Sequence, residues 1–396
     1  MSLLINKHFI GFTHHALLDG DMLRWTNELG DPSYCFGFDN SPLSLEPLLD
    51  LFSESCPSLA PPEVINSFKE CGYDYAPWSK VMPPKRFKKI FAQFISDIQH
   101  CQEKINASEY SSFFVETNRL FSHLRPSTIS EARCHKLLKQ GDNHSLKNIL
   151  EMSRSNILPV PLYNRTSTKT GRLTIKGGPQ ILTLKKEFRT IFTPAKKGNK
   201  LYEIDFTSLE PRVALNIAGR STGPDIYTSF SEERGLNVQR DISKLAILCS
   251  LYGAGTAKLD SVLRSSSHSI SANALMKEVN EHFQIAVLSK ALRSQASEGT
   301  ITNCFGRPIV VDEARDAILV NNFLQSSATD IALAGFLDFC EKLKDDIKPI
   351  FIIHDALIFE ADPNKLDSVV QYIDNGYELS EVGNFPLSIS EFGYNG

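Results

Sequence analysis

Apolar side chains recur at helical spacing in the stretch from about residue 80 to 155. Phe87, Ile90, Phe91 and Phe94 lie three or four positions apart, which places them on one face of an α-helix. Residues 1–75 show no such period and are rich in Pro, Ser and aromatic side chains. We therefore expect irregular structure at the N-terminus, followed by a mainly helical region.

The second half of the chain mixes short strand patterns with longer helical ones. The segment LYEID at 201–205 predicts a strand that leads into a helix at 208–219. Near the C-terminus two apolar runs meet at His354 and Asp355, which predicts a tight hairpin. Further helices are predicted over 238–252, 271–295 and 312–340.

The composition is that of a folded chain without a membrane span. A hydrophobic fraction of 42% and a charged fraction of 22% argue against long disorder. No run of about eighteen apolar residues could cross a bilayer, and the first residues lack the pattern of a signal peptide. None of the 8 cysteines forms a CxxC pair, so we expect neither a zinc site nor a disulfide framework, and a reducing cytoplasm.

Positive charge is concentrated although the net charge is −4. Residues 159–200 carry ten Lys or Arg against one acid, Glu187, and residues 80–89 carry five without any acid. Residues 340–396 have four lysines and eleven acids. Basic stretches of this size suit a nucleic-acid backbone. The alternative is that they are solvated surface loops.

Two aspartates stand where a catalytic carboxylate would be useful. Asp205 ends the predicted strand and Asp355 lies at the hairpin, each beside apolar residues. Burying such an acid is costly unless something compensates it. On adjacent strands, the two could jointly hold a pair of Mg²⁺ ions for phosphoryl transfer. The alternative for each aspartate alone is a cap or turn residue.

A second group lies on the predicted helix at 238–252. Arg240, Lys244, Leu248 and Tyr252 are four positions apart, so together they span roughly 120° of the helix surface. A face that grades from cations to an apolar residue and a Tyr suits the phosphates, sugar and base of a nucleoside triphosphate. The alternative is an amphipathic helix with a solvated basic end.

These residues and three further motifs resemble family A DNA polymerases over about residues 164–396. The segment DFTSLEPR contains Asp205, Glu210 and Arg212, and the helix above supplies Arg240, Lys244, Leu248, Tyr252 and Gly253. The hairpin supplies His354, Asp355 and Ala356. The other matches are Thr170-Gly171-Arg172-Leu173, Phe305-Gly306-Arg307 and the pair Asn321 and Gln325, all in the order of the family.

The resemblance implies a role for each matching residue. Asp205, Asp355 and the backbone carbonyl of Phe206 would bind two Mg²⁺ ions. Arg240 and Lys244 would bind the triphosphate, and Lys244 would also protonate the leaving pyrophosphate. The nucleotide pocket would include Leu248 against the sugar, Tyr252 beside the base pair and Glu210 as a gate against a ribose 2′-hydroxyl. The DNA contacts would be Arg172, Gln325, Asn321, His354 and Lys169, with the basic run 165–200 on the backbone.

Four features depart from the family pattern. Leu248 replaces the usual aromatic residue, Ala356 replaces the acid after the hairpin Asp, and Pro211 follows the gate Glu. The segment Phe38-Asp39-Asn40-Ser41 has the Asp of a proofreading exonuclease motif without its Glu. We therefore expect polymerase activity without 3′–5′ proofreading.

The resemblance also implies an α+β, right-hand polymerase fold with an antiparallel palm sheet, helical fingers and a helical thumb. The expected parts are 1–79 (role unknown), 80–158 (thumb), 159–220 (first part of the palm), 221–319 (fingers) and 320–396 (second part of the palm).

The expected partners are primer–template DNA and dNTPs, with a separate exonuclease, clamp or helicase left open, in the host bacterial cytoplasm if the chain is phage-encoded. The alternatives are a single-subunit RNA polymerase, against which Glu210 speaks, and a non-catalytic polymerase-like protein that binds nucleic acid.

Overall fold

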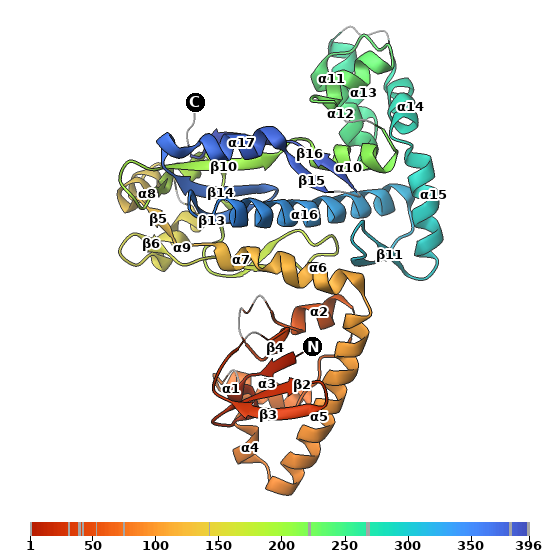
Figure 1. Cartoon of the computed structure of the whole chain (residues 1–396). Coiled ribbons are helices and arrows are strands. Elements are labelled where there is room, and N and C mark those ends of the chain that lie inside the picture. Colours follow the sequence, from red (N-terminus) through yellow and green to blue (C-terminus); the bar gives the residue numbers. More distant parts are fainter. Residues whose placement is uncertain are drawn as a thin grey trace. The chain divides into compact units, whose positions relative to one another are not determined.

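The computed structural model of the chain (Figure 1) falls into two compact units, Met1–Ser122 and His123–Gly396. The region 80–158, which we expected to act as one helical part, contributes residues to both units. The described residues are 2–30, 32–38, 41, 43–52, 54–73, 76–141, 143–220, 223–266, 270–379 and 382–393.

The N-terminal unit contains a four-stranded sheet in the order β3-β2-β1-β4. β1 pairs antiparallel with β2 and parallel with β4. The expectation of irregular structure over 1–75 is therefore wrong. The strands are β1 (Ser2–Ile5), β2 (His15–Asp19), β3 (Met22–Thr26) and β4 (Tyr34–Phe36). The helices of this unit are α1 (Lys7–Ile10), α2 (Glu46–Leu51), α3 (Pro62–Glu70), α4 (Trp78–Val81), α5 (Pro84–Asn106) and α6 (Glu109–Asn118), and α7 (Leu120–His123) spans the boundary.

Helix α5 confirms the helical pattern seen in the sequence. Its Phe87, Phe91 and Phe94 are buried, whereas Ile90 is half-buried. The Phe94 ring lies 5.4 Å from the ring of Phe36 in β4. The apolar face of α5 therefore packs on the small sheet.

The C-terminal unit is built around an antiparallel sheet in the order β13-β14-β10-β17. Its strands are β13 (Ile347–Ile353), β14 (Ala356–Ala361), β10 (Lys200–Phe206) and β17 (Leu387–Glu391). The predicted strand at 201–205 and the predicted hairpin are confirmed. All six side chains of β14 are buried, which fits its place inside the sheet between β13 and β10.

Helix α16 (Asp316–Lys342) runs along one face of this sheet (Figure 1). Phe339 of α16 lies 5.4 Å from the Phe359 ring in β14. Gly335 of α16 leaves room for the end of β10, since an added Cβ would lie 2.6 Å from the Phe206 ring. This contact fixes the end of β10 against the helix.

A group of helices precedes α16 in the chain, and the predicted helix at 238–252 is among them. α12 (Arg240–Leu251) confirms it, but the predicted helix at 271–295 divides into two at Gln284, whose φ of 49° is left-handed. The group comprises α11 (Ile226–Glu233), α12, α13 (Ala257–Ser265), α14 (Ala272–His282) and α15 (Ile285–Ala296).

Shorter elements complete the C-terminal unit. The strands are β5 (Ser127–Ile129), β6 (Ile157–Leu158), β7 (Leu162–Asn164), β8 (Thr174–Gly177), β9 (Phe192–Thr193), β11 (Thr300–Thr302), β12 (Pro308–Val310), β15 (Tyr377–Leu379) and β16 (Gly383–Phe385). The helices are α8 (Glu131–Leu138), α9 (His144–Met152), α10 (Leu209–Ile217) and α17 (Asp367–Asn375). This mixture of helices and antiparallel sheets confirms the α+β class. Over the described part of the chain, no helix has the length and apolar character needed to cross a membrane.

Candidate active site

Adjacent strands bring Asp205 and Asp355 together. Asp205 is opposite Ala356 in the pairing of β10 with β14, and Asp355 directly precedes Ala356. Burial first, and then the negative charges of Asp355 and Glu203, raise the pKa of the Asp205 carboxyl to about 7. The two aspartates that the sequence singled out therefore interact electrostatically, at one end of the sheet.

The Asp205 carboxylate is incompletely satisfied by the protein. Its Oδ1 atom is buried and has no hydrogen-bond partner among the described residues, an arrangement that disfavours the charged form. A bound cation would supply the missing partner. No group of three or more His, Cys, Asp or Glu in the described chain is arranged to hold a metal. Mg²⁺ nevertheless fits two carboxylates and a backbone carbonyl, because substrate phosphates and water complete its shell.

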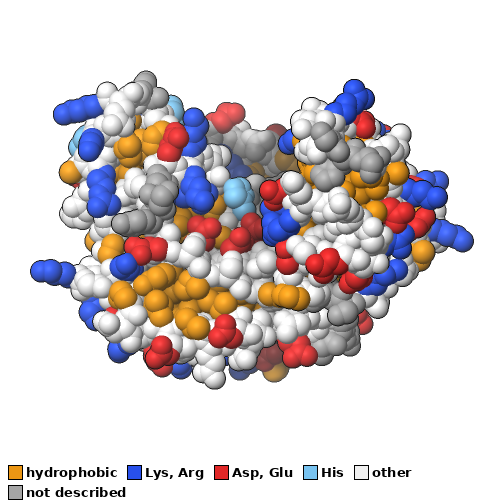
Figure 2. All heavy atoms as spheres, turned by 90° about the horizontal axis from the view of Figure 1, so that it is seen from above, with side chains coloured by type: hydrophobic (Ala, Val, Ile, Leu, Met, Phe, Trp, Pro, Cys, Tyr) orange, Lys and Arg blue, Asp and Glu red, His pale blue; other side chains and the backbone are white. Residues whose placement is uncertain are grey.

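A cleft opens beside these aspartates. Figure 2 shows a hollowed surface on which acidic, basic and histidine side chains come close together. Several segments contribute to the cleft, since its walls come from the loop before β8, from α10, from α16 and from the β13–β14 turn. The lining residues are Arg172, Leu173, Leu209, Glu210, Gln325, Ala328, Thr329, Ala332, His354 and Asp355.

Glu210 connects three of the predicted residues. Its carboxylate lies 3.5 Å from the Arg172 guanidinium and interacts electrostatically with the Tyr252 hydroxyl. Burial raises the pKa of Tyr252, and the charge of Glu210 adds to this, so the phenol keeps its proton and remains a donor. The structure thus brings the predicted gate together with one predicted DNA contact and one predicted nucleotide contact.

The face of α12 on which the sequence predicted nucleotide contacts is accessible to solvent. Arg240 and Lys244 are exposed, and Leu248 and Tyr252 are half-buried. The opposite face, with Ile242, Ala246, Ile247 and Leu251, is buried in the helical group. The four residues therefore share an accessible surface, as their spacing predicted.

Two residues that the sequence analysis did not single out hold the basic end of this face. The Arg240 Nε atom donates to Asp225 Oδ2 at 2.7 Å. The Tyr227 ring lies 5.2 Å from the Arg240 guanidinium and 5.8 Å from the Lys244 ammonium. Asp225 also caps α11 by accepting from the Tyr227 N–H. The only sequence signal for this arrangement is an Asp before a helix, the pattern of an N-cap.

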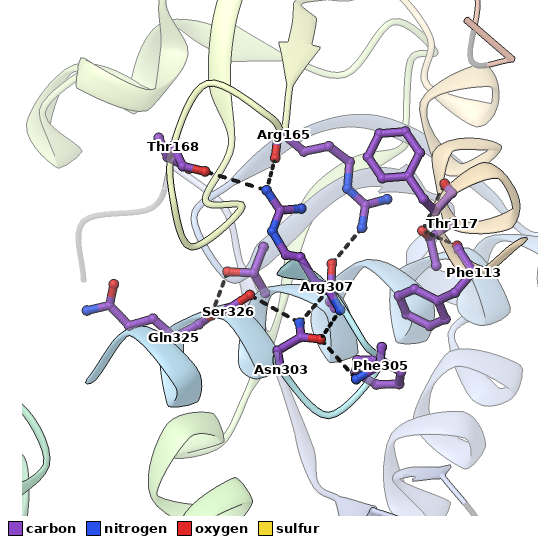
Figure 3. A network of polar contacts seen from close by, with 12 residues as sticks. Phe113, Thr117, Arg165, Thr168, Asn303, Phe305, Arg307, Gln325 and Ser326 are labelled. Atoms are coloured by element: carbon purple, nitrogen blue, oxygen red, sulfur yellow. Dashed lines mark hydrogen bonds and ion pairs between the residues drawn. The ribbon is translucent and has the colours of Figure 1, made fainter. Parts of the chain in front are cut away.

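A buried polar network fixes the loop that carries Arg172 (Figure 3). Arg165 donates to Asp330 of α16 at 2.5 Å, and Asn303 donates to the other oxygen of the same carboxylate at 2.7 Å. Arg307 donates to the Arg165 carbonyl at 2.8 Å. Arg165 is only 3% exposed, so its expected place among the DNA backbone contacts is wrong.

Gly171 is needed for the same loop. Its φ is 76°, in the left-handed region, and an added Cβ would lie 2.9 Å from the Arg307 guanidinium carbon. The buried Arg307 therefore sets the turn that immediately precedes Arg172. This gives a physical reason for the glycine in the Thr170–Leu173 motif.

The remaining predicted DNA contacts differ in their surroundings. Gln325 and His354 line the cleft. The Oδ1 atom of Asn321, one turn before Gln325 on α16, is buried without a hydrogen-bond partner in the described structure. Lys169 forms an ion pair with the exposed Asp312. His354 has a left-handed φ of 56°, a strain of the kind that clusters at functional sites.

Comparison with known proteins gives consistent results. The profile described as DNA polymerase family A matches residues 79–390. DNA polymerase I of Bacillus subtilis (strain 168) is 22% identical over 279 residues, which cover 62% of this chain and 32% of that protein. The DNA polymerase of Mycobacterium phage L5 is 26% identical over 189 residues, 44% of this chain and 30% of the phage protein. The chain thus spans about a third of the length of the curated relatives it matches.

Proposed function

The chain belongs to DNA polymerase family A, and on that premise we propose that it is a DNA-directed DNA polymerase that adds dNTPs to a primer 3′-hydroxyl. One observation carries this proposal. Asp205 and Asp355 meet at the end of two paired strands, beside a cleft that also contains Arg172 and Glu210. All four residues lie within the matched segment.

We assign Asp205, Asp355 and the Phe206 carbonyl to the binding of two Mg²⁺ ions. When bound, such ions stabilise the charge on the attacking and leaving oxygens of the phosphoryl transfer. The chain's contribution is to present the half-buried carboxylate of Asp205 from β10 and the exposed carboxylate of Asp355 from the neighbouring β13–β14 turn. Ala356 supplies no third acid, so the protein donor set stays small.

The triphosphate would lie along α12. Arg240 and Lys244 provide two cations on its accessible face, and Arg240 would exchange Asp225 for a phosphate oxygen. Lys244 would donate a proton to the leaving pyrophosphate. Leu248 would contact the sugar with a smaller surface than the usual aromatic ring.

Glu210 would select deoxynucleotides. Its side chain lines the cleft together with Asp355 and His354, where it would occupy the space of a ribose 2′-hydroxyl. A single-subunit RNA polymerase needs that space. This favours DNA synthesis over RNA synthesis.

Primer–template DNA would be read by shape rather than sequence. Arg172 and Gln325 would contact the minor-groove edge of the terminal pair, His354 the primer end, and Asn321 and Lys169 the nearby DNA. In the corresponding right-hand arrangement, 159–220 and 320–396 form the palm, 221–319 the fingers and 80–158 the thumb. Arg172 would exchange its ion pair with Glu210 for the DNA when the substrate binds.

We also propose that the chain lacks 3′–5′ proofreading. The proposal rests on the missing Glu beside Asp39; Asp39 and Asn40 lie outside the described residues. A labelled mismatched primer incubated with Mg²⁺ but without dNTPs should keep its length. Shortening that persists in Asp205→Ala would reveal a separate nuclease site, or a partner exonuclease in the preparation.

Primer extension tests the main proposal. The chain should extend a primer with dNTPs and Mg²⁺, but poorly with NTPs, and Glu210→Ala should raise NTP use relative to dNTP use. Preferential use of NTPs by the unmodified chain would support an RNA polymerase instead. DNA binding without any extension would support a non-catalytic protein.

A further inference from the structure

The N-terminal unit carries an open aromatic groove between the edge strand β3 and helix α5. Trp25 is 45% exposed, and Phe12 and Leu23 are each 38% exposed, which is unusual for such large apolar side chains. The groove lies outside the site described above, and all of its residues belong to one unit. They are Phe12, Leu23, Trp25, Ser79, Pro84, Phe87, Lys88, Phe91, Ala92 and Ile95.

The aromatic rings of the groove support one another. The Phe12 and Trp25 ring centroids are 4.7 Å apart, and Trp25 stacks on Phe91 at 5.9 Å with an angle of 24° between the rings. Phe91 in turn stacks on Phe87 at 5.6 Å. Because one side of each exposed ring is held by a buried ring, the outer side is a fixed platform for a further flat group.

Cations border this platform. Lys88 lines the groove itself, and Phe12 also lines an adjoining hollow with Lys7, His8 and Lys80. Among the described lining residues of the groove and the hollow there is no Asp or Glu. The groove and the hollow, joined at Phe12, therefore form one track of rings and positive charges.

We propose that this track binds single-stranded DNA. Bases that are free of a partner strand can stack on Phe12 and Trp25, while the backbone phosphates lie against Lys88, Lys80 and Lys7. A duplex keeps its base faces inside the stack and could use only the cations. A purely apolar protein partner would gain nothing from the excess of positive charge. The track thus gives a role to two cations of the basic run 80–89, Lys80 and Lys88.

The two tryptophans of the chain make the binding directly measurable. Trp25 is in the groove, whereas Trp78 is only 6% exposed. In the Trp78→Phe variant, Trp25 is the sole tryptophan, and its fluorescence should be quenched by a short oligo-dT. The quenching should saturate, weaken with salt and be far smaller with a blunt duplex.

Two changes in the Trp78→Phe background test the two components. Phe12→Ala should weaken oligo-dT binding about tenfold, in line with the loss of one stacking partner. Lys88→Glu, at an exposed position that should not disturb folding, should weaken it several-fold and reduce the salt dependence. The matched controls are Tyr73→Ala, an exposed aromatic outside the groove, and Lys69→Glu, an exposed lysine outside it; both should bind as before.

The assay is independent of polymerase activity, since it contains neither dNTPs nor Mg²⁺. Asp205→Ala should abolish extension and leave the quenching unchanged, so the two proposals can fail separately. Absence of quenching by oligo-dT, equal quenching by the blunt duplex, or unchanged affinity in a folded Lys88→Glu variant would each overturn the groove assignment. Quenching by an acidic apolar peptide but not by oligo-dT would point to a protein partner instead.

Discussion

Two carboxylates of the C-terminal unit, Asp330 and Asp205, each have at least one buried oxygen, yet their surroundings are opposite in kind. Asp330 is fully buried and receives Arg165 and Asn303, one on each oxygen. Asp205 has an unsatisfied buried oxygen and like charges as neighbours. The difference separates a carboxylate that completes the fold from one that is left for a ligand.

The largest expected effect is on catalysis. Asp205→Ala and Asp355→Ala should each reduce primer extension by about a thousandfold or more, because the metal ions supply most of the charge stabilisation. DNA binding, measured by fluorescence anisotropy, should stay nearly unchanged. As a matched control, Glu391→Ala removes an acid from β17 of the same sheet, where it pairs with Lys200 at 2.7 Å, and should extend normally. Substantial extension by Asp355→Ala would end the two-metal assignment.

The second-largest expected effect is on stability and concerns Asp330. Asp330→Asn should destabilise the chain by about 3–5 kcal/mol, because it leaves Arg165 as a buried charge without its counterion. Denaturant unfolding measures this change. In the control, Asp312→Asn removes the exposed partner of Lys169 and should change stability by less than about 1 kcal/mol. Equal effects of the two changes would mean that the buried network does not hold the fold.

The pH dependence of stability sharpens the comparison. The pKa of Asp205 is raised from 3.8 to about 7 in the folded chain. Below pH 3.8 this carboxyl is protonated in both the folded and the unfolded chain. Between pH 3.8 and about 7 the folded chain binds more protons than the unfolded chain, so the free energy of unfolding falls as the pH rises. This loss of stability is complete above about pH 7. In metal-free buffer, Asp205→Asn should remove this decline and raise the Tm at pH 8 by a few degrees.

Mg²⁺ is the control for this effect. The ion should stabilise the unmodified chain at pH 8 and leave the Asp205→Asn variant much less affected. A metal-free pH profile that is identical in the two proteins would show that the carboxylate is not strained by its surroundings.

The smallest effect concerns the hairpin. His354→Gly should stabilise the chain by about 0.5–1 kcal/mol, because glycine adopts the left-handed φ of 56° without a steric cost. It should also slow primer extension, since the imidazole is lost from the cleft. A variant that is both less stable and fully active would show that His354 serves the fold instead.

The sequence predicted those elements whose signals are local. The strand ending at Asp205, the hairpin and the accessible face of α12 follow from patterns within about fifteen residues. β3 was missed because all of its side chains are exposed or half-buried, which leaves no alternation to detect. The break at Gln284 was missed because a non-glycine residue takes up the left-handed backbone, and neither Gly nor Pro marks the position.

The network around Asp330 was beyond such reasoning for another reason. Arg165 looks like one more member of a basic run, and Asp330 like one polar residue in an apolar helix. Their pairing spans 165 residues of sequence and depends on the approach of α16 to the loop. Only the three-dimensional arrangement shows which cation is buried and which ones stay at the surface.

The ion pair between Asp225 and Arg240 has a consequence for nucleotide binding and pyrophosphate release in the proposed reaction. A triphosphate that binds has to displace Asp225 from a contact of 2.7 Å with Arg240. Part of its binding free energy therefore offsets the loss of that ion pair. When pyrophosphate departs, the same carboxylate is in place to recapture the guanidinium. We therefore expect Asp225 to shorten the residence time of the product and to make nucleotide binding weaker but more readily reversed. Because Asp225 competes with the phosphates for Arg240, it would help a polymerase that has to release its product at every step along a template.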